Sequence, residues 1–476
     1  MTTLVSAIQT KDSHTENGMV TNSTSLNNCV DLFFQIGAMR GQDKQRLINV
    51  FTKAYGENPL TAMRLLFWAR DVRGGAGERQ IFKDIMSYLA NNRTDVMAKN
   101  IGLISEYGRW DDLLSLIGTP LEKSALDLIA KGLADKNGLC AKWMPRPNVS
   151  NREKKRHANV IRKHLALSPK EYRKLLTENS NTVEQLMCAK EWSKIDYSKL
   201  PSKAMSDLMK AFSKNDLARF QAYLTLVKNG EAKINAGAVY PYDIIKNMNQ
   251  GNTAGANVQW DALPDYMEGN NERLLPMVDV SSSMGSQAGS GKSSVTCLDV
   301  AISLGLYISE RNVGKFQDAF ITFTSSPTLQ YLKGSLSERY EQIQGPVGYD
   351  TNLESAFMMV LNKAIEFKVS VDEMPTMILV LSDMEFNNPS VGGLTAQEMI
   401  EDKYNKAGYK MPKLVYWNIQ SRSDSNKPVQ FDKEGTALVS GFSPALLTNL
   451  LAGKEMTPIS MMMSVIDSER YSKVTI

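Results

Sequence analysis

Residues 274–284 of this 476-residue chain have the sequence Leu-Leu-Pro-Met-Val-Asp-Val-Ser-Ser-Ser-Met. The apolar run is typical of a buried strand, and it ends in oxygen-bearing side chains at alternate positions, Asp279, Ser281 and Ser283. Small oxygen ligands on a turn suit a hard divalent cation such as Mg²⁺, which prefers octahedral oxygen coordination. An ordinary helix-capping turn is the alternative interpretation. The stretch therefore predicts a buried strand that leads into a candidate cation site.

Strand-like runs alternate with helical patterns through the rest of the C-terminal half. Continuous apolar strands that alternate with helices indicate a largely parallel sheet covered on both faces. We therefore expect residues 266–476 to form an α/β, Rossmann-like domain. The expected strands are Leu274–Val280, Ala319–Thr324, Thr376–Leu381, Leu414–Asn418 and Ala437–Phe442, and the expected helices are Val295–Glu310, Leu353–Lys368, Ala396–Ala407 and Pro444–Leu451.

Two further residues complete the candidate site. Thr351 lies on a turn before a helix, and Asp383 follows a second buried strand. With Asp279, Ser281 and Ser283 they match, position by position, the metal-dependent adhesion site of the von Willebrand factor A fold. That resemblance implies direct ligation by the three hydroxyls, while the two carboxylates act mostly through bound water. A Mg²⁺ ion, or another divalent cation, whose two carboxylates act through bound water has no directly bound anion and therefore attracts an acidic ligand.

A phosphate-binding loop is a competing interpretation of Ala288–Ser293, Ala-Gly-Ser-Gly-Lys-Ser. The strict pattern needs glycine at position 286, where this chain has Ser286, and such a loop follows its strand directly. Here Asp279–Ser283 occupies that turn. The stretch is better interpreted as a Gly/Ser loop that enters the next helix.

The N-terminal half has a helical pattern. Leu47, Val50, Phe51 and Ala54 recur at three- and four-residue spacing, as in an amphipathic helix. Ser168-Pro169 followed by Glu171 has the form of a capping box with proline in the first turn. Many short helices in series with no strand signal favour a HEAT-like α-helical repeat over residues 28–265, although no strict sequence period is present.

Composition marks two further segments. Residues 1–27 are rich in Thr, Ser and Asn, and we expect a mobile tail. Residues 251–272 are rich in Gly, Asn and Asp, and we expect a linker or a long loop between the two domains.

The formal net charge of +4 conceals an asymmetry between the halves. Residues 1–265 carry 37 Lys and Arg against 27 Asp and Glu, whereas the remainder carries 18 against 24. A basic front half favours the docking of a polyanion there.

The basic excess is concentrated in residues 152–174, where only Glu153 and Glu171 oppose it. Such density attracts phosphates, and the nearby Trp143 and Tyr172 offer stacking surfaces for single-stranded RNA. A solvated helix face is the alternative. The candidate RNA-binding residues are Lys154, Lys155, Arg156, Arg162, Lys163, Arg173 and Lys174. The glycines of Arg70–Arg79 can form an anion nest or, equally, a structural turn between helices.

Four scattered cysteines without metal-ligand spacing fit a reducing, cytoplasmic compartment. The start of the chain lacks the pattern of a secretory signal, and no apolar run approaches the roughly 18 residues of a membrane helix. We expect no membrane association.

Over nearly the whole chain after residue 28, the sequence resembles the TROVE/Ro family of RNA-binding proteins, especially its uncharacterised relatives. The resemblance implies a ring of helical repeats closed by the A-type domain, with small RNAs as ligands. The Ro RNA contacts do not map onto this chain residue by residue. The stretches that carry the resemblance are Arg70–Arg79, Tyr107–Asp112, Lys142–Arg146, Val278–Met284 and Ser382–Phe386.

The favoured function is a non-catalytic, ribonucleoprotein-type scaffold that binds small or single-stranded RNA through the helical repeats. Its cation site would engage an acidic group of a partner. A protein–protein adaptor or chaperone-like scaffold that acts through the cation site alone is the alternative, and an enzyme ranks third. The three histidines, His14, His157 and His164, lie outside the cation segments, so histidine acid–base chemistry is not expected there.

Overall fold

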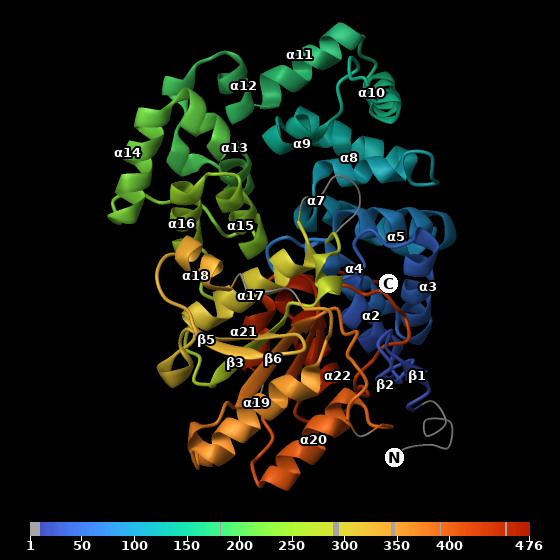
Figure 1. The fold of residues 1–476 in the computed structure, drawn as a ribbon. Helices are drawn as coiled ribbons and strands as arrows, with labels where there is room; N and C mark the ends of the chain where they lie inside the picture. Colours follow the sequence, from blue (N-terminus) through green and yellow to red (C-terminus); the bar gives the residue numbers. More distant parts are fainter. Residues whose placement is uncertain (1–9, 181, 289–294, 344–347, 391, 453–454) are drawn as a thin grey trace.

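The computed structural model describes residues 10–180, 182–288, 295–343, 348–390, 392–452 and 455–476. The chain has a helical N-terminal part and a C-terminal α/β part that contains a six-stranded mixed sheet (Figure 1). Most of the phosphate-loop-like stretch Ala288–Ser293 lies outside the described residues.

The central sheet has the strand order β5-β4-β3-β6-β7-β8. All neighbouring pairs are parallel except β4 and β5, which are antiparallel. Strand β3 is the first of the six along the chain and lies between β4 and β6, so the chain reverses its direction of travel across the sheet at this point, as in doubly wound folds. The strands are β3 (Leu274–Asp279), β4 (Ala319–Phe323), β5 (Thr328–Tyr331), β6 (Met377–Ser382), β7 (Lys413–Asn418) and β8 (Thr436–Ser440).

Helices cover the sheet on both sides. Helix α17 links β3 to β4, whereas α19 precedes β6 and α20 links β6 to β7 on the other side of β3. Because parallel crossovers are right-handed, α17 lies on the opposite face of the sheet from α19 and α20. Helices α19 and α20 pack side by side (Figure 1). The helices of this part are α17 (Cys297–Arg311), α18 (Leu336–Ile343), α19 (Leu353–Glu366), α20 (Ala396–Ala407), α21 (Leu446–Ala452) and α22 (Pro458–Ile466).

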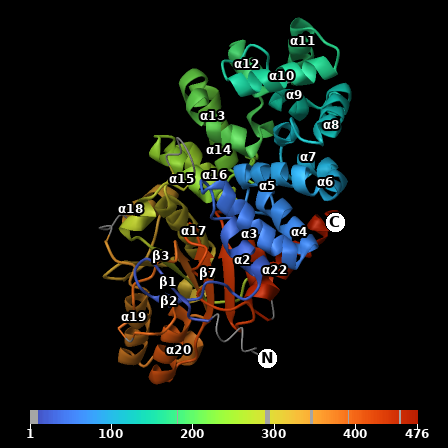
Figure 2. The same ribbon diagram turned by 90° about the vertical axis from the view of Figure 1, so that its right-hand side faces the viewer.

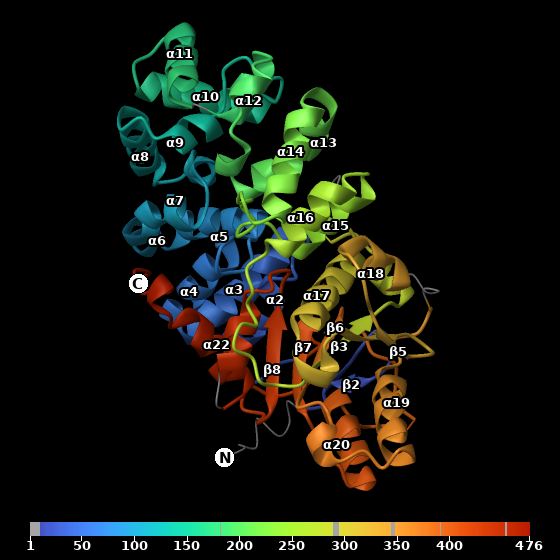
Figure 3. The same cartoon turned by 90° about the vertical axis from the view of Figure 1, so that its left-hand side faces the viewer.

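The helical part leaves the sheet and returns to it. Helix α2 packs against β8, and α15 packs against α17, so both ends contact the α/β part. Helices α10, α11 and α12 lie at the end of the helical part that is far from the sheet (Figures 2 and 3). The α-helices here are α2 (Asn28–Ile36), α3 (Lys44–Glu57), α4 (Pro59–Arg70), α5 (Arg79–Asn92), α6 (Thr94–Asn100), α7 (Ile104–Tyr107), α8 (Glu122–Ala134), α9 (Gly138–Trp143), α10 (Arg152–His164), α11 (Pro169–Ser180), α12 (Val183–Cys188), α13 (Ser202–Asn215), α14 (Leu217–Lys228), α15 (Pro241–Asn249) and α16 (Thr253–Asp261).

One apolar core runs through both parts. Phe33 and Trp68 of the helical part belong to the same buried cluster as Trp417 of the sheet. A smaller, separate cluster around Met209 and Phe212 stabilises the returning helices. The boundary expected at residue 265 therefore separates secondary-structure types and not two independent cores.

The expected linker at residues 251–272 is wrong for its first half, which forms α16. Trp260 is buried there, its ring lies 6.4 Å from that of Tyr307, and its indole N–H donates to Glu310 at 2.5 Å. Trp260 anchors this segment against α17, and Ala256 and Gln259 are also buried, although its Asn- and Gly-rich composition resembles that of a loop.

The described part of the expected mobile tail is also packed. Residues 13–14 (β1) and 20–21 (β2) form a short antiparallel pair, and Met19 is buried. Polar side chains account for the error, because they hydrogen-bond to the α/β part: Thr15 Oγ1 donates to Phe386 O at 2.6 Å and Asn22 Nδ2 donates to Lys427 O at 2.8 Å.

Candidate cation site

The two predicted carboxylates end neighbouring strands at the reversal point of the sheet. Asp279 is the last residue of β3 and Asp383 directly follows β6, and these strands pair in parallel from Leu274↔Met377 to Val278↔Leu381. Both residues are buried, with exposed fractions of 0% and 2%. Ligands of doubly wound sheets bind beyond the carboxyl ends of the strands at such a reversal, and the two carboxylates lie at that end of the sheet.

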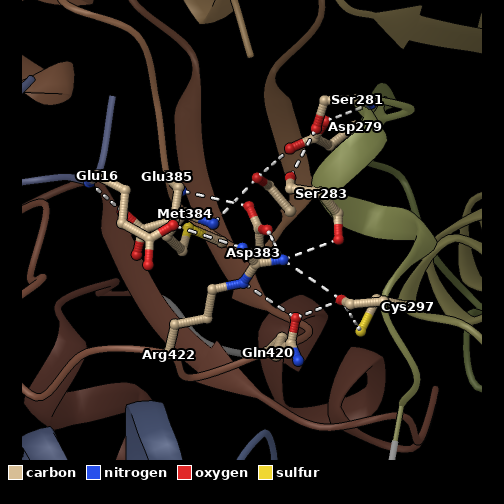
Figure 4. Close-up of polar contacts among 12 residues, drawn as sticks. Glu16, Asp279, Ser281, Ser283, Cys297, Asp383, Met384, Glu385, Gln420 and Arg422 are labelled. Atoms are coloured by element: carbon tan, nitrogen blue, oxygen red, sulfur yellow. Dashed lines mark hydrogen bonds and ion pairs between the residues drawn. The ribbon is translucent and has the colours of Figure 1, made fainter. Parts of the chain in front are cut away.

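The turn after β3 brings its oxygen atoms together (Figure 4). The Oγ atoms of Ser281 and Ser283 lie 3.0 Å apart. Asp279 accepts the main-chain N–H of Ser281 at 2.9 Å and the hydroxyl of Ser382 at 2.5 Å. These bonds hold the carboxylate toward the two serines, which is the arrangement expected for ligands of one ion.

The segment with Thr351 joins the same end of the sheet. Ser282 N donates to Gly348 O at 2.8 Å, and Thr351 exchanges hydrogen bonds with Asn387, four residues after Asp383. Thr351 is buried. All three chain segments with predicted ligands are therefore tied together by hydrogen bonds.

Arg422, which the sequence analysis missed, lies against Asp383. Its guanidinium approaches Asp383 Oδ2 to 3.1 Å and donates to Ser283 O at 2.8 Å. Asp383 Oδ2 accepts no hydrogen bond in the described structure. The guanidinium forms an ion pair with this oxygen, but the two groups are not oriented for a hydrogen bond. The following residue, Met384, has a φ of 67°, an uncommon left-handed conformation for a side chain of its size. Strained positions of this kind cluster at functional sites.

The two carboxylates repel each other. Burial, together with the neighbouring charge of Asp383, raises the pKa of Asp279 to about 7. Burial also raises the pKa of Asp383, although the Arg422 charge opposes that effect. Two buried acids that resist joint ionisation gain from a cation placed between them.

The donor set fits a hard cation better than a soft one. Among the described residues, no three His, Cys, Asp or Glu side chains gather as a metal cluster. A metal at this position would depend on hydroxyls, water and two carboxylates, which suit Mg²⁺ and do not suit Zn²⁺. Asp383 Oδ2 is buried and accepts no hydrogen bond, and its charged neighbour in the described structure is the Arg422 guanidinium.

The predicted RNA-binding residues lie on α10 and α11, which are far from the sheet in Figures 1–3. His157, Ala158 and Ile161 anchor the inner side of α10. Arg162 is partly buried and donates to Asn159 at 2.7 Å. Among described residues, no acidic side chain pairs with Lys154, Lys155, Lys163 or Arg173, and Lys174 pairs with Glu178 at 3.6 Å. The exposed members of the set are Lys154, Lys155, Arg156, Lys163, Arg173 and Lys174.

The proposed stacking and anion sites nearby do not form as expected. Tyr172 is fully buried, and the ring of Trp143 is covered by the Arg109 guanidinium at 3.5 Å. In the Arg70–Arg79 stretch, the N–H groups of residues 75–78 donate to main-chain carbonyls of residues 68–71. Arg70 is buried in an ion pair with Asp112 at 2.7 Å. This stretch therefore forms a turn between helices, and the N–H groups of residues 75–78 are not free for an anion.

No helix within the described residues is long and apolar enough to cross a membrane. The four cysteines are free thiols, of which Cys188 is exposed.

Two family models match this chain, and they meet at residue 274, the start of β3. A family model described as a domain of unknown function (DUF2828) matches residues 15–137 and 126–274, which is more than half of the chain. The chain belongs to the DUF2828 family. A second model, also described as a domain of unknown function (DUF7788), matches residues 274–473 of this DUF2828 protein.

Two individual proteins are similar to this DUF2828 chain. An uncharacterized protein of Acanthamoeba polyphaga mimivirus is 30% identical over 509 residues, covering 96% of this chain and 87% of that protein. The crystal structure of the Deinococcus radiodurans RO (RSR) protein aligns over 93% of this chain and 100% of its own, with a TM-score of 0.39 and 14% identity. At that TM-score and identity the similarity does not establish a common fold.

Proposed function

We propose that this DUF2828 protein is a non-catalytic, ribonucleoprotein-type scaffold with RNA on its helical part and a second, acidic ligand at a Mg²⁺ site. The observation that carries the RNA proposal is the row of exposed cations on α10 and α11. Lys154, Lys155, Lys163 and Arg173 have no acidic partner within the described structure. Phosphates of RNA would supply the missing counter-charges and release ions from the nucleic acid.

The α/β part supports the second half of the proposal. The proposal is supported by the strand order of this part, by its reversal point between β3 and β6, and by the three segments with the predicted ligands that meet at this end of the sheet, as expected of a von Willebrand factor A domain with a metal-dependent adhesion site. In this proposal Ser281, Ser283 and Thr351 ligate the ion. Asp279 and Asp383 supply charge through bound water, and the ion offers an open position to a carboxylate.

The TROVE/Ro resemblance belongs to the same proposal. A helical part that begins and ends on the α/β part is consistent with the arrangement that the resemblance implies. RNA binding is proposed on the strength of the charge distribution of this chain, because a likeness of fold does not transfer a function.

The test is a salt series of RNA binding with charge-matched variants. Replacement of Lys154, Lys155, Arg156, Arg162 and Lys163 by Gln should weaken binding of single-stranded RNA. It should also lower the salt slope by about 0.7 for each RNA phosphate that the variant no longer neutralises. A control variant removes the same charge from the α/β part, by replacement of Lys333, Lys363, Lys368, Lys406 and Lys410 with Gln, and should bind as the native protein does. Filter binding measures the RNA affinity and its salt slope for each variant. An equal loss of affinity in the two variants would mean that net charge, and not the position of the charges, controls RNA binding.

The alternative is a protein–protein adaptor that uses the cation site without nucleic acid. It is favoured by one observation, namely that an acidic residue of the chain itself, Glu16, already lies 3.5 Å from Arg422 beside the site. Under this alternative the native protein retains no RNA at low salt. An acidic protein partner is instead released by a chelator and by Asp279→Asn.

A further inference from the structure

Residues 10–25, here named the N-terminal strap, lie along the loop that follows Asp383. Glu16 N donates to Glu385 Oε2 at 2.6 Å, and Asn17 Nδ2 donates to Glu385 O at 2.6 Å. Asn388 N in turn donates to Asn17 O at 3.2 Å. The main chain of the strap is thus fixed at the rim of the cation site.

The Glu16 side chain reaches from the strap to Arg422 (Figure 4). Its Oε2 lies 3.5 Å from an Arg422 nitrogen, and another nitrogen of the same guanidinium lies 3.1 Å from Asp383. Glu16 is 61% exposed, whereas Arg422 is 23% exposed. One arginine therefore connects a buried carboxylate of the cation site to an exposed carboxylate of the strap.

Arg422 and Glu16 are held very differently. The guanidinium donates to Ser283 O, to Gln420 Oε1 at 3.1 Å and to Ser286 Oγ at 3.3 Å, which fixes it independently of Glu16. Within the described residues the Glu16 carboxylate makes one long, exposed contact, which is weak in water. A competing carboxylate can displace Glu16 from Arg422 without moving the guanidinium.

We propose that Arg422 and the bound cation together form the receptor for a carboxylate of a protein partner, and that Glu16 occupies this receptor in the free protein. This inference rests on the proposed cation site. Two positive groups close together bind a carboxylate more strongly than the ion alone, since each oxygen meets its own counter-charge. The resident group is itself a carboxylate, which identifies the chemical class of the ligand.

The strap therefore supplies an internal carboxylate, Glu16, that competes with external carboxylates for the receptor. Its main-chain bonds keep Glu16 near the receptor after displacement, so the effective concentration of the internal carboxylate stays high. Only a partner that offers a well-placed acid, or several contacts, outcompetes it. The contact between Glu16 and Arg422 would thus protect the site from free small carboxylates.

The test uses the full chain loaded with Mn²⁺ and acetate as the probe. Relaxation of the acetate methyl protons by the paramagnetic ion measures acetate bound at the site. Glu16→Gln should bind acetate several-fold more tightly than the native protein. Arg422→Gln should bind it several-fold more weakly, and Arg422→Lys, which keeps the charge, should lose less.

Asp12→Asn is the matched control, because Asp12 lies on the same strap but bonds to Ser23 and not to Arg422. Its acetate affinity should equal that of the native protein. Native affinity in Glu16→Gln or in Arg422→Gln overturns the inference, as does equal tightening in Asp12→Asn. If the inference fails but the native protein binds Mn²⁺ and Asp279→Asn abolishes that binding, the proposed cation site still stands. Absence of Mn²⁺ binding by the native protein overturns both.

Discussion

Single residues in this protein are governed by burial as much as by type. Asp279 and Asp383 are carboxylates of the same kind as Glu16, yet burial makes them a candidate cation site while exposure leaves Glu16 free to exchange partners. The sequence pattern identified the two aspartates because each ends an apolar run. Arg422 lies four residues beyond the end of β7 and Glu16 precedes the first helix, so neither residue directly ends an apolar run and the pattern offered no signal for them.

His157 gives a prediction at the residue scale. Burial lowers its pKa below the usual 6.5, assisted by Arg156 and Lys83 and opposed by Glu153. In the unfolded chain the imidazole takes up its proton near pH 6.5, whereas the folded protein resists protonation. The stability associated with the neutral ring is therefore fully present above pH 6.5 and is lost as the pH falls toward the lowered pKa.

We expect the unfolding free energy of the native protein to fall more steeply between pH 7 and pH 5 than that of His157→Gln. Urea denaturation across this range measures the difference. Between pH 7 and pH 9 the two proteins should show parallel curves, which serves as the internal control. Parallel curves below pH 6.5 as well would contradict the assignment to His157.

The helices and strands of this fold differ in how clearly the local sequence predicts them. The helices at Ser168, Thr296 and Thr395 begin with hydrogen-bonded capping boxes, and α20 has the bounds expected from the sequence. Strand β5 has mostly exposed residues and no apolar run, because it is an edge strand that pairs only with β4. Local signals predict an element only when its own residues carry the apolar pattern.

The turn at Gly348 gives a prediction at the element scale. A Cβ atom at this position would lie 2.5 Å from the Thr324 side chain, so the turn approaches β4 too closely for any residue but glycine. Gly348→Ala should displace the segment that presents Thr351 and weaken Mn²⁺ binding roughly 10- to 100-fold, as is usual when supporting residues of a metal site are changed.

Gly285→Ala is the control for this variant, because an added Cβ there meets no atom within 4 Å. It should retain native affinity. Titration of Mn²⁺ followed by electron paramagnetic resonance measures free and bound ion directly. Native affinity in Gly348→Ala would show that Thr351 is not a ligand.

The whole molecule is stabilised by contacts between segments from opposite ends of the chain. The C-terminal Arg470 and Tyr471 both bond to Asp71, and Tyr107 donates to Arg470 O. Asn418 and Ser440 of the sheet donate to main-chain carbonyls of α2. Since the apolar core is also continuous, we expect the helical and α/β parts to unfold together.

Tyr471→Ala tests that expectation. The ring is 1% exposed and stacks 5.7 Å from Tyr107, so its removal should cost about 3–5 kcal/mol of unfolding free energy, as for other large aromatic residues. Calorimetry should still show one transition, shifted to lower temperature. Tyr349→Ala, at a side chain that is 90% exposed, should change stability by less than about 0.5 kcal/mol. Two separate transitions in either protein would contradict the shared core.

The sequence by itself determined the class of each half, the five long strands of the sheet and the carboxylates at its reversal point. These features depend on periodicity, capping and apolar runs within a few neighbouring residues, which the chain displays locally. Errors occurred where composition was ambiguous, as in the strap and in α16, because one buried Trp260 or a few bonded polar side chains decide such segments.

Tertiary structure alone decided that Arg422 lies against Asp383, that Glu16 reaches Arg422 across 406 positions of the chain, and that Tyr172 and Arg70 are buried. It also decided that both halves share one core. The physical reason is that each of these contacts depends on the path of the whole main chain, and the energy of an ion pair or a buried ring depends on neighbours that no local pattern specifies.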